Sequence, residues 1–170
     1  PDADIERQAW ERLDALTKPP RSLGRLEEIA ARVAAVQRTL RPEAAPSAIT
    51  LFAGDHGVVA EGVPAGPSEV TFQMGGNFVA GGAAINQIAR SVGAELVLTD
   101  VGVAADTSVF PGVVQEKVRA GTRNMAVEPA LTREEAAAAV LVGVRTVERL
   151  AAAGVKVIAT GEMGIGNTTA

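Results

Sequence analysis

The sequence has no cysteine and only one histidine among its 170 residues. The missing thiols exclude disulfide bonds and thiolate metal sites, and a single histidine excludes a multi-histidine metal site within one chain. Aromatic residues make up 3% of the chain and the net charge is −4. Few aromatics and an acidic balance argue against a nucleic-acid partner or an anionic membrane surface.

Long apolar runs are also absent, since none approaches the ~20 residues that cross a bilayer. The first residues, PDADIERQAW, are acidic and amphipathic and do not resemble a basic leader. We therefore expect a cytoplasmic protein without a membrane partner. What is present is 47% hydrophobic and 21% charged residues, a composition typical of globular domains.

Two helices are expected before any strand. The first ends at Pro19-Pro20, and the second begins near Ser22, a good N-cap. We expect Lys18 and Arg21 to fix the turn between them. Helical spacing predicts that the second helix buries Leu26, Ile29, Val33, Val36 and Leu40.

Strands and helices alternate from residue 48 onward, which predicts an α/β fold with a mostly parallel sheet. Short apolar runs indicate strands at 48–54, 94–103 and 155–160. A helical stripe covers 70–92, where two glycine pairs predict either a break or a close approach of the backbone to a ligand or another helix. Thr132 and Glu135 form a capping box. The helix that it opens is expected to carry its apolar stripe on Ala136, Val140, Val144, Val147 and Leu150.

The last strand leads into a glycine-rich turn, GEMGIGNTT. Its spacing is that of a nucleotide phosphate loop, but Asn167 stands where such a loop has lysine. This departure favours a smaller anion, such as one phosphate monoester, held by backbone amides, Asn167, Thr168 and Thr169. The alternative is a plain strand–helix turn. Glu162 is either an exposed loop acid or a carboxylate beside the ligand.

Other polar residues also end strands. Asp55 and His56 follow the first strand and Asp100 ends the second, so these side chains are expected near the ligand edge of the sheet. For each of them, and for Arg123, ligand contact and structural hydrogen bonds or salt bridges both stay open. A helix should follow Gly166, so we expect this chain to be the N-terminal part of a longer protein or to be completed by another polypeptide.

Six stretches together resemble one family, the nicotinate-nucleotide–dimethylbenzimidazole phosphoribosyltransferases. They occur in the family's order from about residue 13 to the last residue: LTKPPRSLGRLEEIA, FAGDHGVVAEGVPAGPSEVTFQMGGNFVAGGAAIN, TDVGV, PGVV, GTRNMAVEPALTREEA and GEMGIGNTT. The resemblance implies phosphoribosyl transfer from nicotinate mononucleotide to 5,6-dimethylbenzimidazole, giving α-ribazole 5′-phosphate and nicotinate. It also implies a homodimer and a reaction with neither metal nor cofactor.

The resemblance further implies a Rossmann-like sheet over residues 46–170, and a smaller helical domain to which residues 1–45 contribute. Glu162 matches a supporting carboxylate of the family. Further positions match substrate-binding stretches: Asp55, Gly66, Pro67, Gln73, Met74, Met163, Gly164, Gly166, Asn167 and Thr168. Of these, Gly66, Pro67, Gln73 and Met74 match the benzimidazole pocket. The family's principal general base has no match here, so residues 1–170 alone are expected to be inactive.

Two rival hypotheses belong to other classes. One is an α/β domain that binds NAD or ATP, against which the missing lysine and the lack of a third dinucleotide-type glycine count. The other is a non-catalytic binding domain. Tight binding of NAD or ATP without affinity for the mononucleotide would favour the first rival. Ligand binding without turnover would favour the second.

Overall fold

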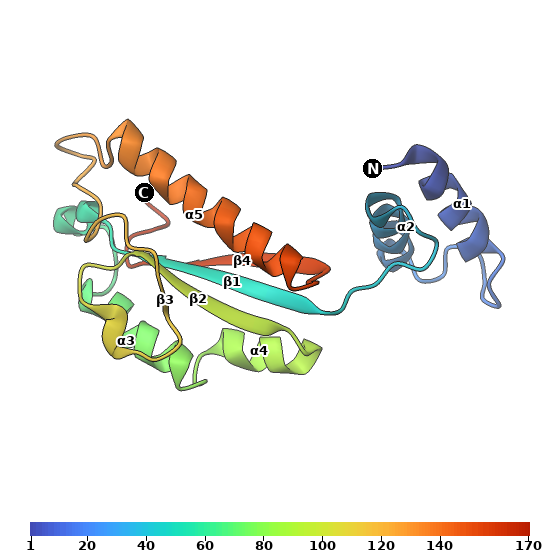
Figure 1. Cartoon of the computed structure of the whole chain (residues 1–170), viewed down its shortest axis with the longest axis horizontal. Helices are drawn as coiled ribbons and strands as arrows, with labels where there is room; N and C mark the ends of the chain where they lie inside the picture. Colours follow the sequence, from blue (N-terminus) through green and yellow to red (C-terminus); the bar gives the residue numbers. More distant parts are fainter. The chain divides into compact units, whose positions relative to one another are not determined.

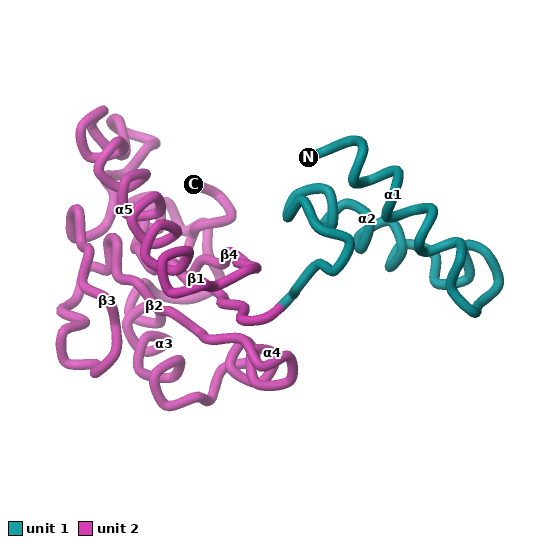
Figure 2. Tube along the Cα trace, turned by 45° about the vertical axis from the view of Figure 1, so that its right-hand side comes forward, with its two compact units in different colours: residues 1–44 teal, residues 45–170 magenta.

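The computed structural model describes all residues from Pro1 to Ala170. They fall into two compact units, Pro1–Ala44 and Ala45–Ala170, which Figure 2 shows in different colours. No helix in either unit has both the length and the apolar character that crossing a membrane requires.

The first unit contains two helices, α1 (Ala3–Asp14) and α2 (Arg25–Gln37). The Asp2 side chain caps α1 by accepting hydrogen bonds from two amides of its first turn, which would otherwise lack partners. The helices pack through small side chains, because Ala9, Ala31 and Ala34 form the centre of their contact. Larger apolar residues, including Ile5 and Leu13, surround that centre.

The apolar stripe that the sequence predicts on α2 is largely exposed. Leu26, Ile29 and Val36 are exposed, while the buried face of α2 carries Ala31 and Ala34. The predicted buried face was therefore wrong for these three residues. Periodicity locates an apolar stripe, but alanines allow the closer approach of two helix axes and so formed the contact instead.

A buried ion pair holds the turn between α1 and α2. Lys18 Nζ lies 2.8 Å from Oε1 of Glu27, and the same oxygen accepts a hydrogen bond from the amide of Leu23. Glu27 is only 1% exposed, and its bond to Lys18 lowers the pKa of its carboxyl group. Arg21 lies over the Trp10 ring, 3.8 Å from its centroid. The expected role of Lys18 and Arg21 in this turn is confirmed.

The second unit is built on four parallel strands in the order β3-β2-β1-β4. They are β1 (Ser47–Gly54), β2 (Glu95–Gly102), β3 (Val114–Gln115) and β4 (Val157–Met163). β1 lies inside the sheet and is mostly buried, as its continuous apolar run predicts. The predicted α/β fold with a parallel sheet is confirmed.

Helices lie on both faces of this sheet: α3 (Glu69–Val79), α4 (Ala84–Val92) and α5 (Arg133–Ala152). Figure 1 shows α5 on one face and α3 with α4 on the other. The chain moves from β1 to β2 in one direction and from β3 to β4 in the opposite direction. Right-handed crossovers therefore place the connecting helices on opposite faces. This arrangement opens a crevice beyond the carboxyl ends of β1 and β4.

The helical stripe of residues 70–92 is broken between α3 and α4. Gly81 has a φ of +79°, which favours glycine because it has no Cβ. Asn86 then closes the turn by accepting from the Ala83 amide at 3.1 Å and donating to the Phe78 carbonyl at 2.9 Å. The glycine pair thus ends one helix and allows the next to begin.

The other glycine pair, Gly75 and Gly76, makes room for an aromatic ring. A Cβ at Gly76 would lie 3.1 Å from the Phe110 ring, and one at Gly75 would lie 3.4 Å from it. Phe110 also packs against Phe72, with 4.8 Å between ring centroids. The close approach expected here therefore involves a loop side chain, not a ligand or another helix.

The capping box of α5 forms as predicted. Thr132 Oγ1 accepts from the Glu135 amide at 3.1 Å, and Glu135 Oε2 accepts from the Thr132 amide at 2.7 Å. The stripe of Val140, Val144 and Val147 is exposed, however. The helix instead buries Val142, Thr146 and Leu150, so Leu150 is the one residue of the apolar stripe that is buried.

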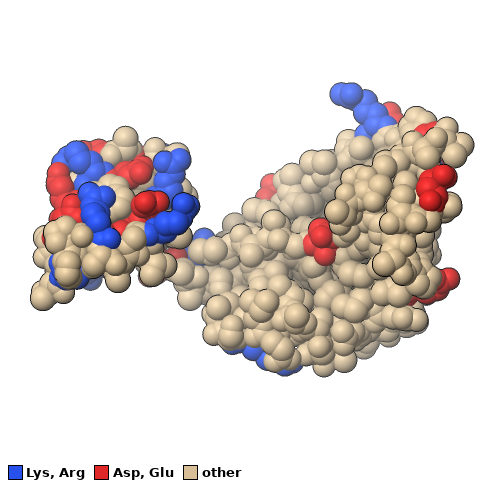
Figure 3. Space-filling view, turned by 180° about the vertical axis from the view of Figure 1, so that it is seen from behind, with Lys and Arg blue, Asp and Glu red and all other residues tan.

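The second unit has two core clusters, a smaller one in which Leu150 of α5 packs on Ala48 and Val97 of the sheet, and a larger one between the sheet and α3. The larger cluster is formed by Leu51, Ala53, Leu98, Phe78 and Val103 together with Ala83. Burying one large apolar side chain stabilises a fold by about 1.5–3 kcal/mol. Charges are sparse on the face of this unit in Figure 3, whereas the Pro1–Ala44 unit there shows both signs close together.

Candidate functional site

A cavity of about 470 Å³ lies at the carboxyl ends of the strands in the second unit. Its lining comes from the ends of β1, β2 and β4, from the segment 118–122, and from one side of α5. Open parallel sheets bind their ligands in this position. The polar side chains around it are Asp55, His56, Arg119, Thr122, Glu162 and Asn167.

Asp55 presents a buried carboxylate to this cavity. It is 8% exposed, and its Oδ2 accepts a hydrogen bond from the Ala104 amide at 2.7 Å. Its Oδ1 is also buried but has no hydrogen-bond partner in the chain. A buried polar atom without a partner is costly, so Oδ1 favours a donor from a ligand or from water.

His56 lies beside Asp55 and faces the same cavity. Burial lowers the pKa of its imidazole, and this effect outweighs the opposing attraction of Asp55 and Glu162. The ring is therefore neutral at pH 7, because the ordinary pKa of histidine is already ~6.5. Its Nδ1 is buried without a hydrogen-bond partner, which makes it a second group that can meet a ligand.

The glycine turn packs closely against the end of β1. A Cβ at Gly164 would lie 2.0 Å from the Gly54 carbonyl oxygen and 3.0 Å from the His56 ring. Gly166 has a φ of +87°, and the Asn167 amide donates to the Gly164 carbonyl at 3.1 Å. A positive φ at the third residue of such a turn requires glycine. Gly164 is therefore required by the close approach of the Gly54 carbonyl, and Gly166 by its positive φ.

Some amides of this turn have no partner in the chain, among them those of Gly166 and Thr168. The Asn167 and Thr169 amides donate to carbonyls of the turn, but the Gly166 and Thr168 amides make no hydrogen bond within the chain. Thr168 is exposed, and its hydroxyl donates to Asn167 Oδ1 at 3.2 Å. Free backbone amides at a glycine turn are donors suited to an anion.

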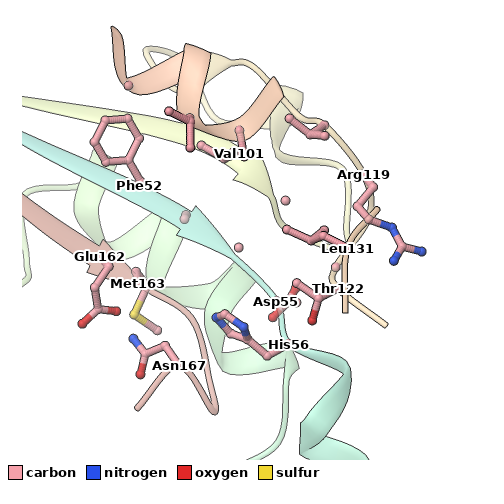
Figure 4. Close-up of a pocket in the computed structure, with 18 residues that line it drawn as sticks. Phe52, Asp55, His56, Val101, Arg119, Thr122, Leu131, Glu162, Met163 and Asn167 are labelled. Carbon is pink, nitrogen blue, oxygen red and sulfur yellow. The ribbon is translucent and has the colours of Figure 1, made fainter. Parts of the chain in front are cut away.

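The end of β4 brings three of the predicted site residues to the cavity: Glu162, Met163 and Asn167. Glu162 pairs in register with Phe52 of β1, so both belong to the same face of the sheet. Figure 4 shows Glu162, Asn167 and His56 around one side of the cavity. With Asp55, the structure therefore groups four of the predicted residues directly and places Gly164 and Gly166 immediately behind them.

The remaining predicted residues lie elsewhere. Gly66 and Pro67 precede α3, and Gln73 and Met74 belong to it; none of the four lines the cavity. Gln73 is exposed, while Met74 packs against the core of the second unit. The structure thus separates the expected benzimidazole stretch from the lining of this cavity.

Asp100 makes structural contacts. It is fully buried, and its carboxylate accepts from the Val103 amide at 2.8 Å and from the Thr107 hydroxyl. Lys117 Nζ lies 3.3 Å from Oδ2. Asp100 therefore holds the loop that follows β2.

Arg123 also makes a structural contact. It forms a two-pronged ion pair with Glu135, at 2.6 and 3.0 Å. This pair lowers the pKa of Glu135 to about 2. It ties the segment after β3 to the first turn of α5.

Sequence reasoning missed Arg119, Thr122 and Thr71. Arg119 and Thr122 line the cavity, and Thr122 Oγ1 accepts from the Gly57 amide at 3.1 Å. Thr71 lies on α3 and binds the glycine turn. Of the three, only Thr122 lies in a stretch that the sequence analysis singled out, GTRN.

No group of three histidine, cysteine, aspartate or glutamate side chains is placed to hold a metal ion.

A family model described as Phosphoribosyltransferase matches residues 1–170. The chain belongs to this family. The resemblance to a phosphoribosyltransferase family, expected from the six sequence stretches, is therefore confirmed. It is 51% identical over 169 residues to the nicotinate-nucleotide–dimethylbenzimidazole phosphoribosyltransferase of Thermus thermophilus, and the match covers 99% of this chain and 50% of that relative. It is 53% identical over 169 residues to the Geobacter metallireducens protein of the same name, covering 99% and 48%.

A solved structure of the Thermus thermophilus protein of that name superposes with a TM-score of 0.94 at 50% identity. The superposition covers 99% of this chain and 51% of that one. The chain thus spans about half the length of the relatives that it matches. This likeness confirms the fold of the segment.

Proposed function

We propose that this chain forms the N-terminal half of an enzyme that transfers phosphoribosyl from nicotinate mononucleotide to 5,6-dimethylbenzimidazole. The observation that carries the proposal is the pairing of a lysine-free glycine turn with the Glu162 carboxylate at one cavity. It is supported by the names of relatives about half identical to the chain. In this proposal, residues 1–45 contribute to a smaller helical domain, and the protein acts as a homodimer in the cytoplasm.

The glycine turn holds the single phosphate of the mononucleotide. The amides of Gly166 and Thr168 are free to donate to its oxygens, and the Asn167 side chain faces the same cavity. A triphosphate needs a lysine against the charge of its outer phosphates, whereas one phosphate monoester can be held by amides and neutral side chains. The absence of a lysine fits this ligand.

Glu162 supplies the negative charge that the reaction needs. As nicotinate leaves, positive charge develops at C1′ of the ribose, and a carboxylate nearby stabilises that charge more in the transition state than in the ground state. Glu162 lies at the exposed end of β4 on the wall of the cavity. Its charge would repel the phosphate, so it faces the ribose and not the turn.

Asp55 and His56 meet the ribose from the end of β1. The phosphate and the nicotinate carboxylate cannot donate to Asp55 Oδ1, but a ribose hydroxyl can. His56 is neutral, since burial lowers its pKa, so its imidazole can accept or donate one hydrogen bond. These contacts give partners to two buried atoms that have none in the chain.

The family resemblance assigns the acceptor base to the stretch of Gly66, Pro67, Gln73 and Met74, although none of the four lines the cavity within these 170 residues. A general base outside these 170 residues removes the azole N–H proton, and the azole nitrogen donates its electron pair to C1′. The bond from C1′ to the pyridine nitrogen breaks, and its electron pair neutralises the pyridinium to give nicotinate. Attack opposite the leaving group converts the β-nucleotide to an α-riboside.

The test measures nicotinate release by the full-length protein and its Glu162→Gln variant. The substitution keeps size and hydrogen bonding but removes the charge, so we expect kcat to fall by about 100-fold with little change in affinity for the mononucleotide. Glu134→Gln, on an exposed acid of α5 outside the cavity, is the matched control and should keep the wild-type rate.

Binding to residues 1–170 separates the proposal from its rivals. Calorimetric titration with nicotinate mononucleotide should give a measurable Kd, whereas ATP and NAD should bind more weakly. Tighter binding of ATP or NAD, or an unchanged rate in the Glu162→Gln variant, would contradict the proposal.

A further inference from the structure

We propose that Thr71 is a positioning residue that sets the conformation of the phosphate-binding turn. Thr71 lies on α3 and is 1% exposed. Its Oγ1 accepts a hydrogen bond from the Ile165 amide at 3.0 Å, across 94 residues of sequence. The inference rests on the proposed function, because it assigns the turn to the phosphate of a nucleotide.

The hydrogen bond fixes which amides of the turn face inward. The Ile165 amide points into the protein toward Thr71, and the Asn167 amide closes the turn on Gly164. The intervening Gly166 amide and the following Thr168 amide are left without partners in the chain. Thr71 thereby holds the turn in an arrangement that leaves these two donors available to an anion.

The turn is pressed against the end of β1 from its other side. Gly164 contacts the Gly54 carbonyl and the His56 ring, and a Cβ at Gly166 would lie 3.0 Å from Val59. These contacts are van der Waals contacts and set distance, but they carry little directional preference. The bond to Thr71 is the directional contact that sets the rotation of the Ile165 peptide.

Thr71 also joins the two parts of the proposed site. Residues three apart on a helix share a face, so Thr71 lies next to Met74 on α3, the helix that carries the proposed acceptor-base stretch. A movement of α3 on binding the acceptor base would therefore pass directly to the Ile165 amide. The hydrogen bond between Thr71 and Ile165 thus connects the helix proposed to contact the acceptor base with the turn proposed to bind the phosphate.

The experiment compares Thr71→Val with Thr71→Ser by titration with nicotinate mononucleotide and, separately, with inorganic phosphate. Valine keeps the volume but leaves the part-buried Ile165 amide without its partner, so we expect about tenfold weaker binding of both ligands. Serine keeps the acceptor and should bind within about twofold of the wild type. Thr146→Val, at a buried threonine of α5, is the matched control for losing a buried hydroxyl and should also bind normally.

Hydrogen exchange gives a readout that general destabilisation does not move. The Ile165 amide should be protected in the wild type and in Thr71→Ser, and should exchange selectively faster in Thr71→Val. If Thr71→Val does not fold, Thr71→Ala replaces it in both measurements. Unchanged affinity, or an equal loss in the Thr146 variant, would overturn the inference.

The two proposals can fail separately. If the wild type binds neither nicotinate mononucleotide nor phosphate, the proposed function fails, and exchange at Ile165 still decides whether Thr71 holds the turn. If the wild type binds the mononucleotide and Thr71→Val binds it equally well, only the positioning role fails.

Discussion

β1 and β4 are neighbouring parallel strands with similar apolar sequences, yet their surroundings differ. β1 pairs on both edges, and its four consecutive residues from Ala48 to Leu51, three of them apolar, are all buried. β4 pairs only with β1, and its residues are exposed or partly exposed. Within these 170 residues, the strand with partners on both edges is therefore the more buried of the two.

The two strand ends contribute differently to the site. The end of β1 is held firmly, because Gly57 packs against the backbone of 122–124 and the Thr122 amide donates to the Asp55 carbonyl at 2.9 Å. The end of β4 carries the exposed Glu162 and the glycine turn. The two strand ends therefore have different roles. The end of β1 supplies the polar groups of Asp55 and His56 in fixed positions, and β4 supplies the accessible charge of Glu162.

Truncating each strand tests the comparison most strongly. Leu51→Ala in β1 removes a buried side chain from the core, so we expect a loss of about 2–5 kcal/mol in the free energy of unfolding. Ile158→Ala in β4 removes a partly buried side chain and should cost about half as much or less. Urea unfolding followed by circular dichroism measures both; equal losses would mean that the two strands are equally important to the core.

Gly164→Ala tests how the end of β4 is seated on β1. The added Cβ would lie 2.0 Å from the Gly54 carbonyl oxygen, so the backbone must move, at a cost of about 1–3 kcal/mol. Gly143→Ala is the matched control, since a Cβ there meets nothing within 4 Å. As a helix-interior glycine it should gain up to about 1 kcal/mol when replaced. Thermal unfolding of the two variants should shift in opposite directions, and a shift in the same direction would contradict the packing described here.

The ion pair between Arg123 and Glu135 gives the smallest expected effect, and that effect depends on pH. Arg123 lowers the pKa of Glu135 to about 2, against ~4.3 for an unperturbed glutamate. Because the folded pKa is the lower one, the pair stabilises the fold above the unfolded pKa, and this contribution is lost as pH falls from about 4.3 toward 2. Glu135→Gln should remove that part of the acid sensitivity. Unfolding curves collected across this pH range check it, and parallel curves for both proteins would show that the pair contributes nothing.

Local patterns predicted much of this molecule from sequence. The apolar run of β1, the capping box at Thr132 and the tight turn implied by Gly166 are set by neighbouring residues, and each is found in the structure. The glycine turn and Glu162 were likewise readable, because they follow directly from the last strand.

Features that depend on distant residues were not predictable. The stripe of Val140, Val144 and Val147 has helical spacing, but the sheet meets the face carrying Val142. Nothing near Gly75 indicates that the Phe110 ring will fill its place. The contact of Thr71 with the glycine turn could not be predicted from its neighbours in sequence, because its partner is 94 residues away.

The central position of β1 has a consequence for synthesis on the ribosome. β1 is made well before the strand that covers one of its edges, since Thr50 is hydrogen-bonded to Ala159 across 109 residues. Until then that edge is open to pairing with other chains, and non-local parallel pairing is slow to form. A nascent chain that stalls before β4 would leave this edge of an apolar strand unpaired, which favours aggregation.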